Sequence, residues 1–375
     1  MDNGAALSTR FLPAFRAALW RKTHSGFPPY EDTDMTGLQL IAEFEHQVTG
    51  IAVTPEDRVF VNFPRWTEDS PISVAERLAD GTLRPYPDEA WNAWRNETAF
   101  EKPMGEHFVC VQALLADTRG GLWVLDPGAP GNERVMPGAA KLVHIDLGSD
   151  RVTKVIPFPE NVALQGSYLN DIRLSPDGRT GYITDSGSKG AIIVVDLDTG
   201  QSFRALDGHP STQLEQDVIV EVDGAPLRRP DGRQPIFASD GIAISNDGAT
   251  LYWQALTGRT LYRIPTDRLG RNVGEDECRA AVEKVGTTHV ADGLLIARDD
   301  TLYLTSPGDN AVRRWSGNGT EIVVQDERLR WPDTLSQGPD GAIYVTASHI
   351  QDTYWFKPGA PAAVRTALFR FQPPG

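Results

Sequence analysis

A six-fold repeat of short β-hairpins constrains the fold of this 375-residue chain more than any other feature. In each copy an apolar strand leads into a tight turn and a second apolar strand leads out of it, as in SDGIAISNDGATLYWQA (residues 239–255). Alternating apolar residues around a turn rich in Asp, Asn and Gly are typical of a β-hairpin. The six turn residues are Asp57, Gly120, Gly178, Gly248, Asp300 and Gly341. Six equivalent hairpins predict six equivalent structural units.

The length of the units predicts an all-β fold, a six-bladed β-propeller. Each unit reads as four strands over about 40 to 70 residues, which is typical of propeller blades, and 35 Gly and 27 Pro supply the many turns. Residues 1–36 are predicted to be an N-terminal leader and residues 37–375 a single propeller domain, with an excursion between units at about residues 67–105. We expect the first unit to take its outer strand from a chain terminus, which closes the ring.

Composition narrows the class of partner. A net charge of −15 and a pI near 4.9 disfavour nucleic acid, because a phosphate backbone would be repelled. Two cysteines form neither a disulfide framework nor a zinc spacing, and no apolar run is long enough to cross a membrane. No signal peptide is recognisable, so we expect a cytoplasmic protein, although a mature secreted chain would have the same composition. The expected partner is a small molecule, and the expected state is a monomer or small homo-oligomer.

A column of polar residues lies eight positions before the six turn residues. Its members are Thr49, Gln112, Asn170, Asp240, Asp292 and Asp333. In a propeller the first strand of every blade lines the central channel, so the column is predicted to converge at one mouth. Carboxylates packed there would repel one another by several kcal/mol as an order of magnitude, so they either bind a cation or stay partly protonated.

An all-oxygen donor set suits a hard divalent cation, with Ca²⁺ first and then Mg²⁺ or Mn²⁺. The predicted metal ligands are Asn170, Asp240, Asp292 and Asp333. The alternative is that an Asp before Gly at a strand start only stabilises a turn through hydrogen bonds to backbone amides.

Loops that follow the second strands are predicted to wall a pocket above the column. Asp292 is the candidate base, and His289 and His349 are candidate proton carriers. The candidate substrate-binding residues are Gln112, Asp171, Arg65, Trp66, Gln254 and Trp331. The alternatives are structural roles for both histidines and core positions for the tryptophans.

Several phrases of the sequence resemble the yellow/major royal jelly protein family in its bacterial form. The likeness covers about residues 40–350 and includes VTGIAVTPEDRVFVNFPRW, YLNDIRLSPDGRTGYITDSG and SDGIAISNDGATLYWQALTG. That resemblance implies a six-bladed propeller, similar in turn to the senescence-marker protein/gluconolactonase group of divalent-metal lactonases. Insect relatives include proteins that tautomerise dopachrome and others that only bind small ligands, so the resemblance leaves the activity open.

Resemblance to the metallolactonases places Asn170 on a metal-site or substrate asparagine, Asp240 on a metal ligand, and Asp292 on the aspartate that is both ligand and base. The departure is in the first unit, where those enzymes have a glutamate and this column has Thr49. Either Glu43 or Glu45 just upstream, or Asp333 across the ring, replaces it, or the metal is weakly held or absent.

Three hypotheses follow. The first is a metal-dependent hydrolase of a cyclic ester, a lactonase, in which the cation polarises the carbonyl and activates water. The second is an isomerase of an aromatic or quinonoid substrate, similar to a dopachrome tautomerase, that uses the same acid and base groups without a required metal. The third is a non-catalytic propeller that binds a small ligand in the acidic, tryptophan-walled mouth.

Overall fold

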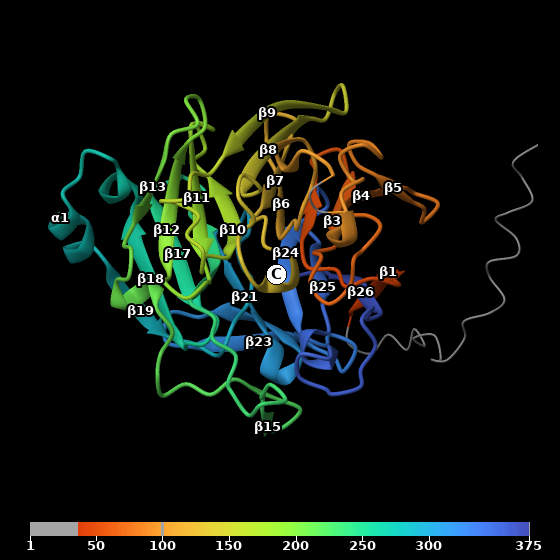
Figure 1. Cartoon of the computed structure of the whole chain (residues 1–375). Coiled ribbons are helices and arrows are strands. Elements are labelled where there is room, and N and C mark those ends of the chain that lie inside the picture. Colours follow the sequence, from red (N-terminus) through yellow and green to blue (C-terminus); the bar gives the residue numbers. More distant parts are fainter. Residues whose placement is uncertain (1–36, 99–100, 375) are drawn as a thin grey trace, which may run out of the picture. The chain divides into compact units, whose positions relative to one another are not determined.

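The computed structural model describes residues 37–98 and 101–374, and it confirms the six-bladed propeller (Figure 1). The predicted leader, residues 1–36, lies outside the described residues. From residue 37 onward the described chain belongs to one compact unit. Each blade is a four-stranded antiparallel sheet whose strands follow one another outward from the channel.

Blades one to three occupy the first half of the domain. Blade one contains β2 (Ile51–Val53), β3 (Val59–Asn62), β4 (Val74–Arg77) and β5 (Leu83–Pro85). Blade two contains β6 (Ala113–Ala116), β7 (Gly121–Asp126), β8 (Lys141–Asp146) and β9 (Arg151–Pro157). Blade three contains β10 (Leu169–Leu174), β11 (Thr180–Asp185), β12 (Ala191–Asp196) and β13 (Ser202–Ala205).

Blades four to six complete the circle. Blade four contains β16 (Ser239–Ile244), β17 (Thr250–Ala255), β18 (Thr260–Pro265) and β19 (Glu283–Thr287). Blade five contains β20 (Leu294–Ile296), β21 (Leu302–Ser306), β22 (Ala311–Trp315) and β23 (Thr320–Gln325). Blade six contains β24 (Pro332–Gln337), β25 (Ile343–Ala347), β26 (Thr366–Phe371) and β1 (Gln39–Phe44). A small hairpin, β14 (Glu221–Val222) and β15 (Ala225–Pro226), and one short helix, α1 (Glu275–Ala280), lie in the connections.

The innermost strands form a closed circle around the channel. Each of β2, β6, β10, β16, β20 and β24 contacts the innermost strand of the next blade, and β24 contacts β2 again. The expectation that the first unit borrows its outer strand is wrong: the sixth blade does so, because β1 pairs antiparallel with β26. Pairing the N-terminal strand with the C-terminal one satisfies both edges at the seam.

Backbone geometry confirms the repeat read from the sequence. All six turn residues have left-handed backbone, with φ of 65° at Asp57, 82° at Gly120, 61° at Gly178, 74° at Gly248, 66° at Asp300 and 87° at Gly341. Only Gly, Asn and Asp adopt this conformation at small cost, which is why these residue types mark the turns.

The segment at residues 67–105 is not simply an excursion between units. It contains β4 and β5, which pair with each other and with β3 as the outer half of blade one. A long loop between Asn62 and Val74 hid this pairing, because it replaces the short connection seen in blades three, four and five. The inserted segment therefore begins only after Pro85.

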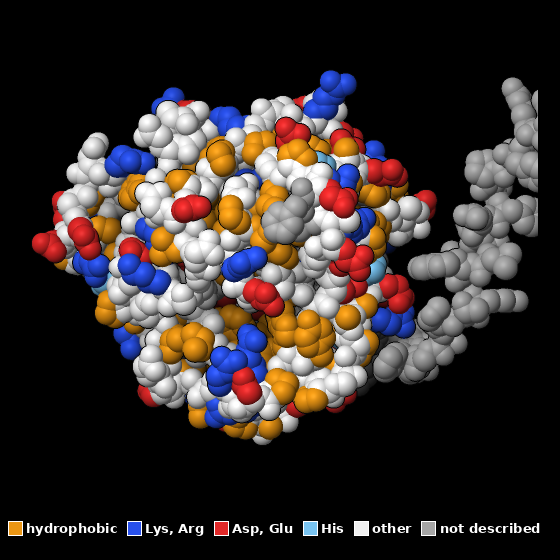
Figure 2. Space-filling view, in the orientation of Figure 1, with side chains coloured by type: hydrophobic (Ala, Val, Ile, Leu, Met, Phe, Trp, Pro, Cys, Tyr) orange, Lys and Arg blue, Asp and Glu red, His pale blue; other side chains and the backbone are white. Residues whose placement is uncertain are grey.

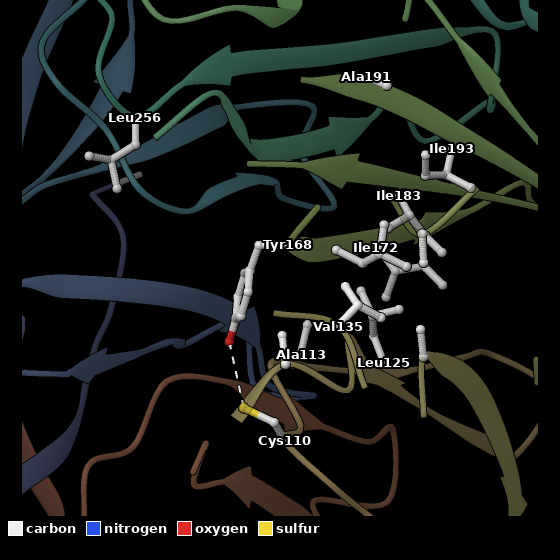
Figure 3. Close-up of a cluster of buried hydrophobic side chains, with 14 of the residues drawn as sticks. Cys110, Ala113, Leu125, Val135, Tyr168, Ile172, Ile183, Ala191, Ile193 and Leu256 are labelled. Carbon is white, nitrogen blue, oxygen red and sulfur yellow. Dashed lines mark hydrogen bonds between the residues drawn. The ribbon is translucent and has the colours of Figure 1, made fainter. Parts of the chain in front are cut away.

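Hydrophobic packing between neighbouring blades holds the circle together. One buried cluster joins blades one and two through Phe60, Leu114 and Val143, and another joins blades three and four through Ile192 and Trp253. The largest cluster lies between blades two and three and extends over one mouth of the channel, where Tyr168 and Leu256 belong to it (Figure 3). Among the described residues no helix is long and apolar enough to cross a membrane.

Candidate active site

Irregular strand starts turn the column residues toward the channel. In β10, β16 and β24 the pairing register shifts between Leu169 and Ile172, Ser239 and Ile242, and Pro332 and Leu335. An extra residue of this kind re-aims neighbouring side chains. The side chains of Gln112, Asn170, Asp240, Asp292 and Asp333 line two small cavities at this end of the channel. Five of the six column residues are therefore brought together.

We call Asn170, Asp240, Asp292 and Asp333 the acidic ring. Asn170 Nδ2 donates to Asp240 Oδ2 over 2.8 Å, and Asp240 lies within hydrogen-bond reach of Asp292. Asp333 accepts from Ser348 Oγ at 2.8 Å and from Thr334 Oγ1 at 3.1 Å. All four side chains are at least nine-tenths buried.

Burial is the first cause of the unusual ionisation of the ring. It raises the pKa of Asp240 and of Asp333 well above the ordinary aspartate value, and the charge of Asp292 raises both further. Burial also raises the pKa of Asp292, to about 6, against the opposing hydrogen bonds from Trp331 and Asp240. Burial and mutual repulsion therefore favour a ring with one ionised carboxylate beside protonated carboxyl groups.

Trp331 holds Asp292 in place. Its indole Nε1 donates to Asp292 Oδ2 over 2.6 Å, and the side chain is completely buried. The backbone of Trp331 has φ of 53°, which costs a bulky residue about 1–3 kcal/mol. Hydrogen bonds from Ser348 N to Trp331 O and from His349 N to Arg330 O keep this strained loop against the next one. Strain held in this way at a buried acid is typical of functional sites.

Aromatic side chains wall the cavity above the ring. Trp66 Nε1 donates to Tyr168 Oη over 2.5 Å, and Tyr168 Oη donates to Gln112 Oε1 over 3.0 Å, which connects the wall to the column. Trp355 packs on Trp66 with ring centroids 5.6 Å apart. The cavity between these side chains measures about 30 Å³, which is room for water but not for an organic ring.

Thr49 does not join the acidic ring. Its Oγ1 accepts from Asn62 Nδ2 at 2.8 Å and donates to the backbone carbonyl of Gln112. Neither upstream glutamate replaces it: Glu43 is exposed on the outermost strand β1, and Glu45 pairs with Arg365 at 3.3 Å. The glutamate of the metallolactonases therefore has no counterpart in blade one.

Asp171 lies on the far side of the ring, inside the channel. It lines the second small cavity and forms a 2.9 Å ion pair with Arg173 Nη1. Arg173 also donates from Nη2 to the backbone carbonyl of Leu294 across the channel. This pair lies between the small cavity and the opposite end of the channel.

Four of the predicted site residues lie outside the pocket. Arg65 is completely buried and donates to Ser73 Oγ and to the carbonyls of Phe108 and Val109. It therefore connects the loop before β4 to the segment before β6. Gln254 Nε2 donates to the carbonyl of His289 over 2.7 Å. Both side chains therefore hold neighbouring segments together, and neither lines the cavities at the acidic ring.

The two histidines are also turned elsewhere. The ring of His289 is exposed, with Nδ1 2.8 Å from Thr320 Oγ1 of the outer strand β23. His349 Nδ1 lies 3.2 Å from Asp352 Oδ2, in a group of charges that includes Arg330 and Lys357. His289 lies between β19 and β20, and His349 lies in the loop after β25. In both segments local hydrogen bonds, rather than the position in the repeat, set the direction of the side chain.

Other pocket residues carry no signal in the repeat. Tyr168, Phe237 and Trp355 line the cavity, yet Phe237 and Trp355 come from connections outside the hairpins. Tyr168 could have been predicted from the sequence, because it lies two residues before the column residue Asn170 and residues two apart in an extended segment face the same side. Figure 3 shows it reaching toward Cys110 of the neighbouring blade.

The chemistry of the ring fits a hard cation, whereas its present spacing is not that of a preformed cage. Its donors are oxygens of three carboxyl groups and an amide, whose mutual repulsion a cation would relieve. Over residues 37–98 and 101–374, however, no group of three or more His, Cys, Asp or Glu side chains is spaced to hold a metal ion. Asn170 presents its Nδ2 to Asp240 and its Oδ1 to Gln112, so an amide flip would be needed for it to be a ligand.

These features define a six-bladed β-propeller with a buried acidic ring at one mouth of its channel. More particularly, the chain belongs to the major royal jelly protein family, whose sequence model matches residues 109–354. The resemblance seen in the sequence is thereby confirmed. No curated protein sequence matches the chain.

Solved structures show the same fold at low sequence identity. A gluconolactonase from Xanthomonas campestris is 11% identical, with a TM-score of 0.53 over 90% of this chain and 89% of that one. A luciferin-regenerating enzyme is 12% identical, with a TM-score of 0.54 over 90% and 95%. Regucalcin from Agrobacterium tumefaciens, a calcium-binding protein, is 14% identical, with a TM-score of 0.50 over 89% and 94%. The kinship with gluconolactonase-like propellers is thus one of fold.

Proposed function

We propose that this propeller hydrolyses a small cyclic ester, a lactone, at the acidic ring. The observation that carries the proposal is a pair of buried carboxyl groups, Asp292 and Asp240, that lie within hydrogen-bond reach of each other, where burial raises the pKa of both. A general base and a general acid side by side are what hydrolysis at neutral pH requires. The gluconolactonase-like fold supports the same reaction class.

Three groups of the ring have a role in this proposal. The indole of Trp331 orients Asp292. Asp292 accepts a proton from a water molecule while the oxygen of that water adds to the lactone carbonyl carbon. Protonated Asp240 gives its proton to the ring oxygen as the carbon–oxygen bond breaks, and a hydroxy acid leaves. Asn170 Nδ2, which donates to Asp240 Oδ2, keeps that carboxyl group oriented.

We also propose that the ring takes a divalent cation, with Ca²⁺ the first candidate. Asp240, Asp292 and Asp333 would hold it, releasing protons as they ionise. A bound cation would polarise the substrate carbonyl and lower the pKa of a bound water. The regucalcin-like fold supports this proposal.

Substrate entry requires the aromatic wall to move. A cavity of about 30 Å³ holds a water molecule but no organic ring. Trp355 belongs to the loop after the short 3₁₀ turn Ile350–Asp352 and also contacts the guanidinium of Arg229. We propose that this loop swings outward to admit the lactone.

The test is a proton-release assay on a panel of lactones, with and without excess chelator. Activity that disappears with the chelator and returns with Ca²⁺ supports hydrolysis in which the cation takes the place of the protonated Asp240, because a metal-bound Asp240 is ionised and has no proton to give. Activity that survives the chelator supports the carboxyl pair alone. Absence of turnover on every lactone removes hydrolysis as the function.

A second candidate is an isomerase of an aromatic or quinonoid substrate. The specific observation that favours it is the wall of Trp66, Tyr168, Trp331 and Trp355, because flat aromatic surfaces stack on flat rings. Asp292 and Asp240 would then move a proton between two positions of one substrate. Loss of dopachrome absorbance by the wild-type protein, absent in Asp292→Asn, would favour this candidate over the lactonase.

A further inference from the structure

The opposite end of the channel contains a much larger cavity. We call this end the turn mouth, because the hairpin turns at Arg119 and Gly178 border it. The cavity measures about 590 Å³ and is lined by the innermost strands of all six blades, which is within the usual size of a small-molecule site. Arg173 and Asp171 separate it from the acidic ring.

The walls of the turn mouth are aliphatic. Leu115, Leu174, Ile244 and Ile296, from four different blades, line the cavity and are only half-buried. Four half-exposed aliphatic side chains in one concave site retain apolar surface that a ligand can cover, at about 25 cal/mol for each Å² removed from water. Scattered exposed leucines would carry no such meaning.

One wall is aromatic and uncharged. Trp123 packs on His144 with ring centroids 4.5 Å apart, and its Nε1 donates to Asp117 Oδ2 over 2.9 Å. Burial lowers the pKa of His144, so it is neutral near pH 7. Its Nδ1 lies 2.6 Å from Thr153 Oγ1.

The acidic side chains at this mouth already have partners. Asp117 accepts from the backbone N–H groups of Arg119 and Gly121 as well as from Trp123. Asp146 accepts from Ser149 N and Oγ. These carboxylates therefore have little capacity left for a cationic ligand.

Arg173 gives the cavity its polarity. The residue is 8% exposed and lines the cavity. Within the described chain its hydrogen bonds go out from Nη1 and Nη2, to Asp171, Ile172 and Leu294. The Nε–H group is left to donate to a ligand oxygen, while a second guanidinium, that of Arg119, lies at the rim.

We propose that the turn mouth is a second binding site, for a small amphipathic organic anion whose apolar body lies on the aliphatic wall and whose anionic oxygen meets Arg173. This site is independent of the chemistry proposed at the acidic ring. Its ligand has the opposite charge preference, because the lining contains the guanidinium groups of Arg173 and Arg119, while its carboxylates already accept hydrogen bonds.

The test is a fluorescence titration of the full chain with anilinonaphthalene sulfonate, which has an apolar body and one sulfonate. We expect saturable binding of one equivalent and weaker binding of its uncharged analogue, N-phenylnaphthylamine. Ile244→Glu should raise the Kd at least tenfold, because it places a carboxylate on the aliphatic wall. Ile322→Glu, on the exposed outer strand β23, is the matched control and should leave Kd unchanged.

Leu174→Trp guards against misfolding of the first variant. It fills the cavity without adding charge, so it should also abolish binding while the thermal unfolding midpoint stays close to that of the wild type. Binding that both variants leave unchanged would overturn the proposal, as would binding without saturation. Tighter binding of the uncharged analogue would overturn the role of Arg173.

Discussion

The two mouths of the channel differ in almost every property that decides ligand binding. The acidic ring lies at one mouth, fully buried beneath aromatic walls and around cavities of about 30 and 10 Å³. The turn mouth is a largely aliphatic cavity of about 590 Å³ whose lining includes Arg173 and Arg119. Acid–base chemistry depends on buried carboxyl groups that shift one another's pKa, whereas binding of an organic ligand depends on volume and apolar surface. The first set of features lies at one end of the channel and the second at the other.

The difference arises from the strands themselves. At the ring mouth β10, β16 and β24 start with register shifts, which turn polar side chains toward the axis. Further along the same strands regular pairing resumes, and aliphatic residues such as Leu174 and Ile244 face the channel. The net charge of −15 does not describe each mouth of the channel, because the turn mouth contains Arg173 and Arg119. On the face that Figure 2 displays, acidic and basic side chains are interspersed.

Removing the base should give the largest effect. Asp292→Asn keeps the shape of the side chain and removes its ability to accept a proton, so turnover should fall by about 10²–10⁴-fold. The matched control is Asp231→Asn, an exposed aspartate paired with Arg233, which should leave turnover unchanged. Equal activity in Asp292→Asn and the wild type would remove the acidic ring from the reaction and erase the contrast between the mouths.

Calcium should stabilise the protein in a pH-dependent way. Metal binding displaces protons from Asp240 and Asp333, so it is stronger at about pH 8 than at about pH 5. A hundredfold excess over Kd adds about 3 kcal/mol to the free energy of unfolding, which a calorimetric scan would detect as a higher unfolding temperature. Asp240→Asn should lose most of this increase. An equal increase at both pH values, or in the variant, would mean that Ca²⁺ binds outside the ring.

Trp331→Phe should shift the pH profile of turnover. The indole hydrogen bond lowers the pKa of Asp292, so its loss raises that pKa above about 6. Since the ionised form is the base, the acidic limb of the profile should move to higher pH by up to about one unit. Trp315→Phe, in the outer half of blade five, is the control. A lower plateau with no shift of the limb would indicate a packing defect only.

The smallest effect is on stability. Asp240 and Asp333 have raised pKa values in the folded state, so the folded protein retains protons that the unfolded chain loses. Their contribution is fully present below about pH 4, and it is lost as the pH rises through the folded-state pKa values. Without added metal, Asp333→Asn should therefore raise the free energy of unfolding near pH 8 by about 1 kcal/mol. A denaturant titration showing a loss instead would mean that Asp333 is ionised and well paired.

The repeat could be read from the sequence because its turns demand particular residues. Asp57 and Asp300 stand where glycine stands in the other turns, and all six have left-handed backbone. Counting eight residues back from them located Asp240, Asp292 and Asp333, although nothing in that count revealed the register shifts that aim the side chains.

What the sequence could not supply depends on contacts between distant segments. Thr49 occupies the column position but bonds to Asn62 of its own blade, and β1 completes blade six rather than blade one. His289 lies three residues before Asp292 and still points to an outer strand. Trp355 reaches the pocket from a loop of no regular pattern. Side-chain direction in such segments is set by packing, which spacing alone does not encode.

The central claim is that the acidic ring holds protons at neutral pH and exchanges them for a cation. Infrared difference spectroscopy of the metal-free protein tests it most directly, because a protonated carboxyl group absorbs apart from carboxylates. The account predicts a protonated-carboxyl band near pH 7 that weakens in Asp240→Asn and in Asp333→Asn and disappears when Ca²⁺ is added. A spectrum without that band, unchanged by either substitution, would contradict it.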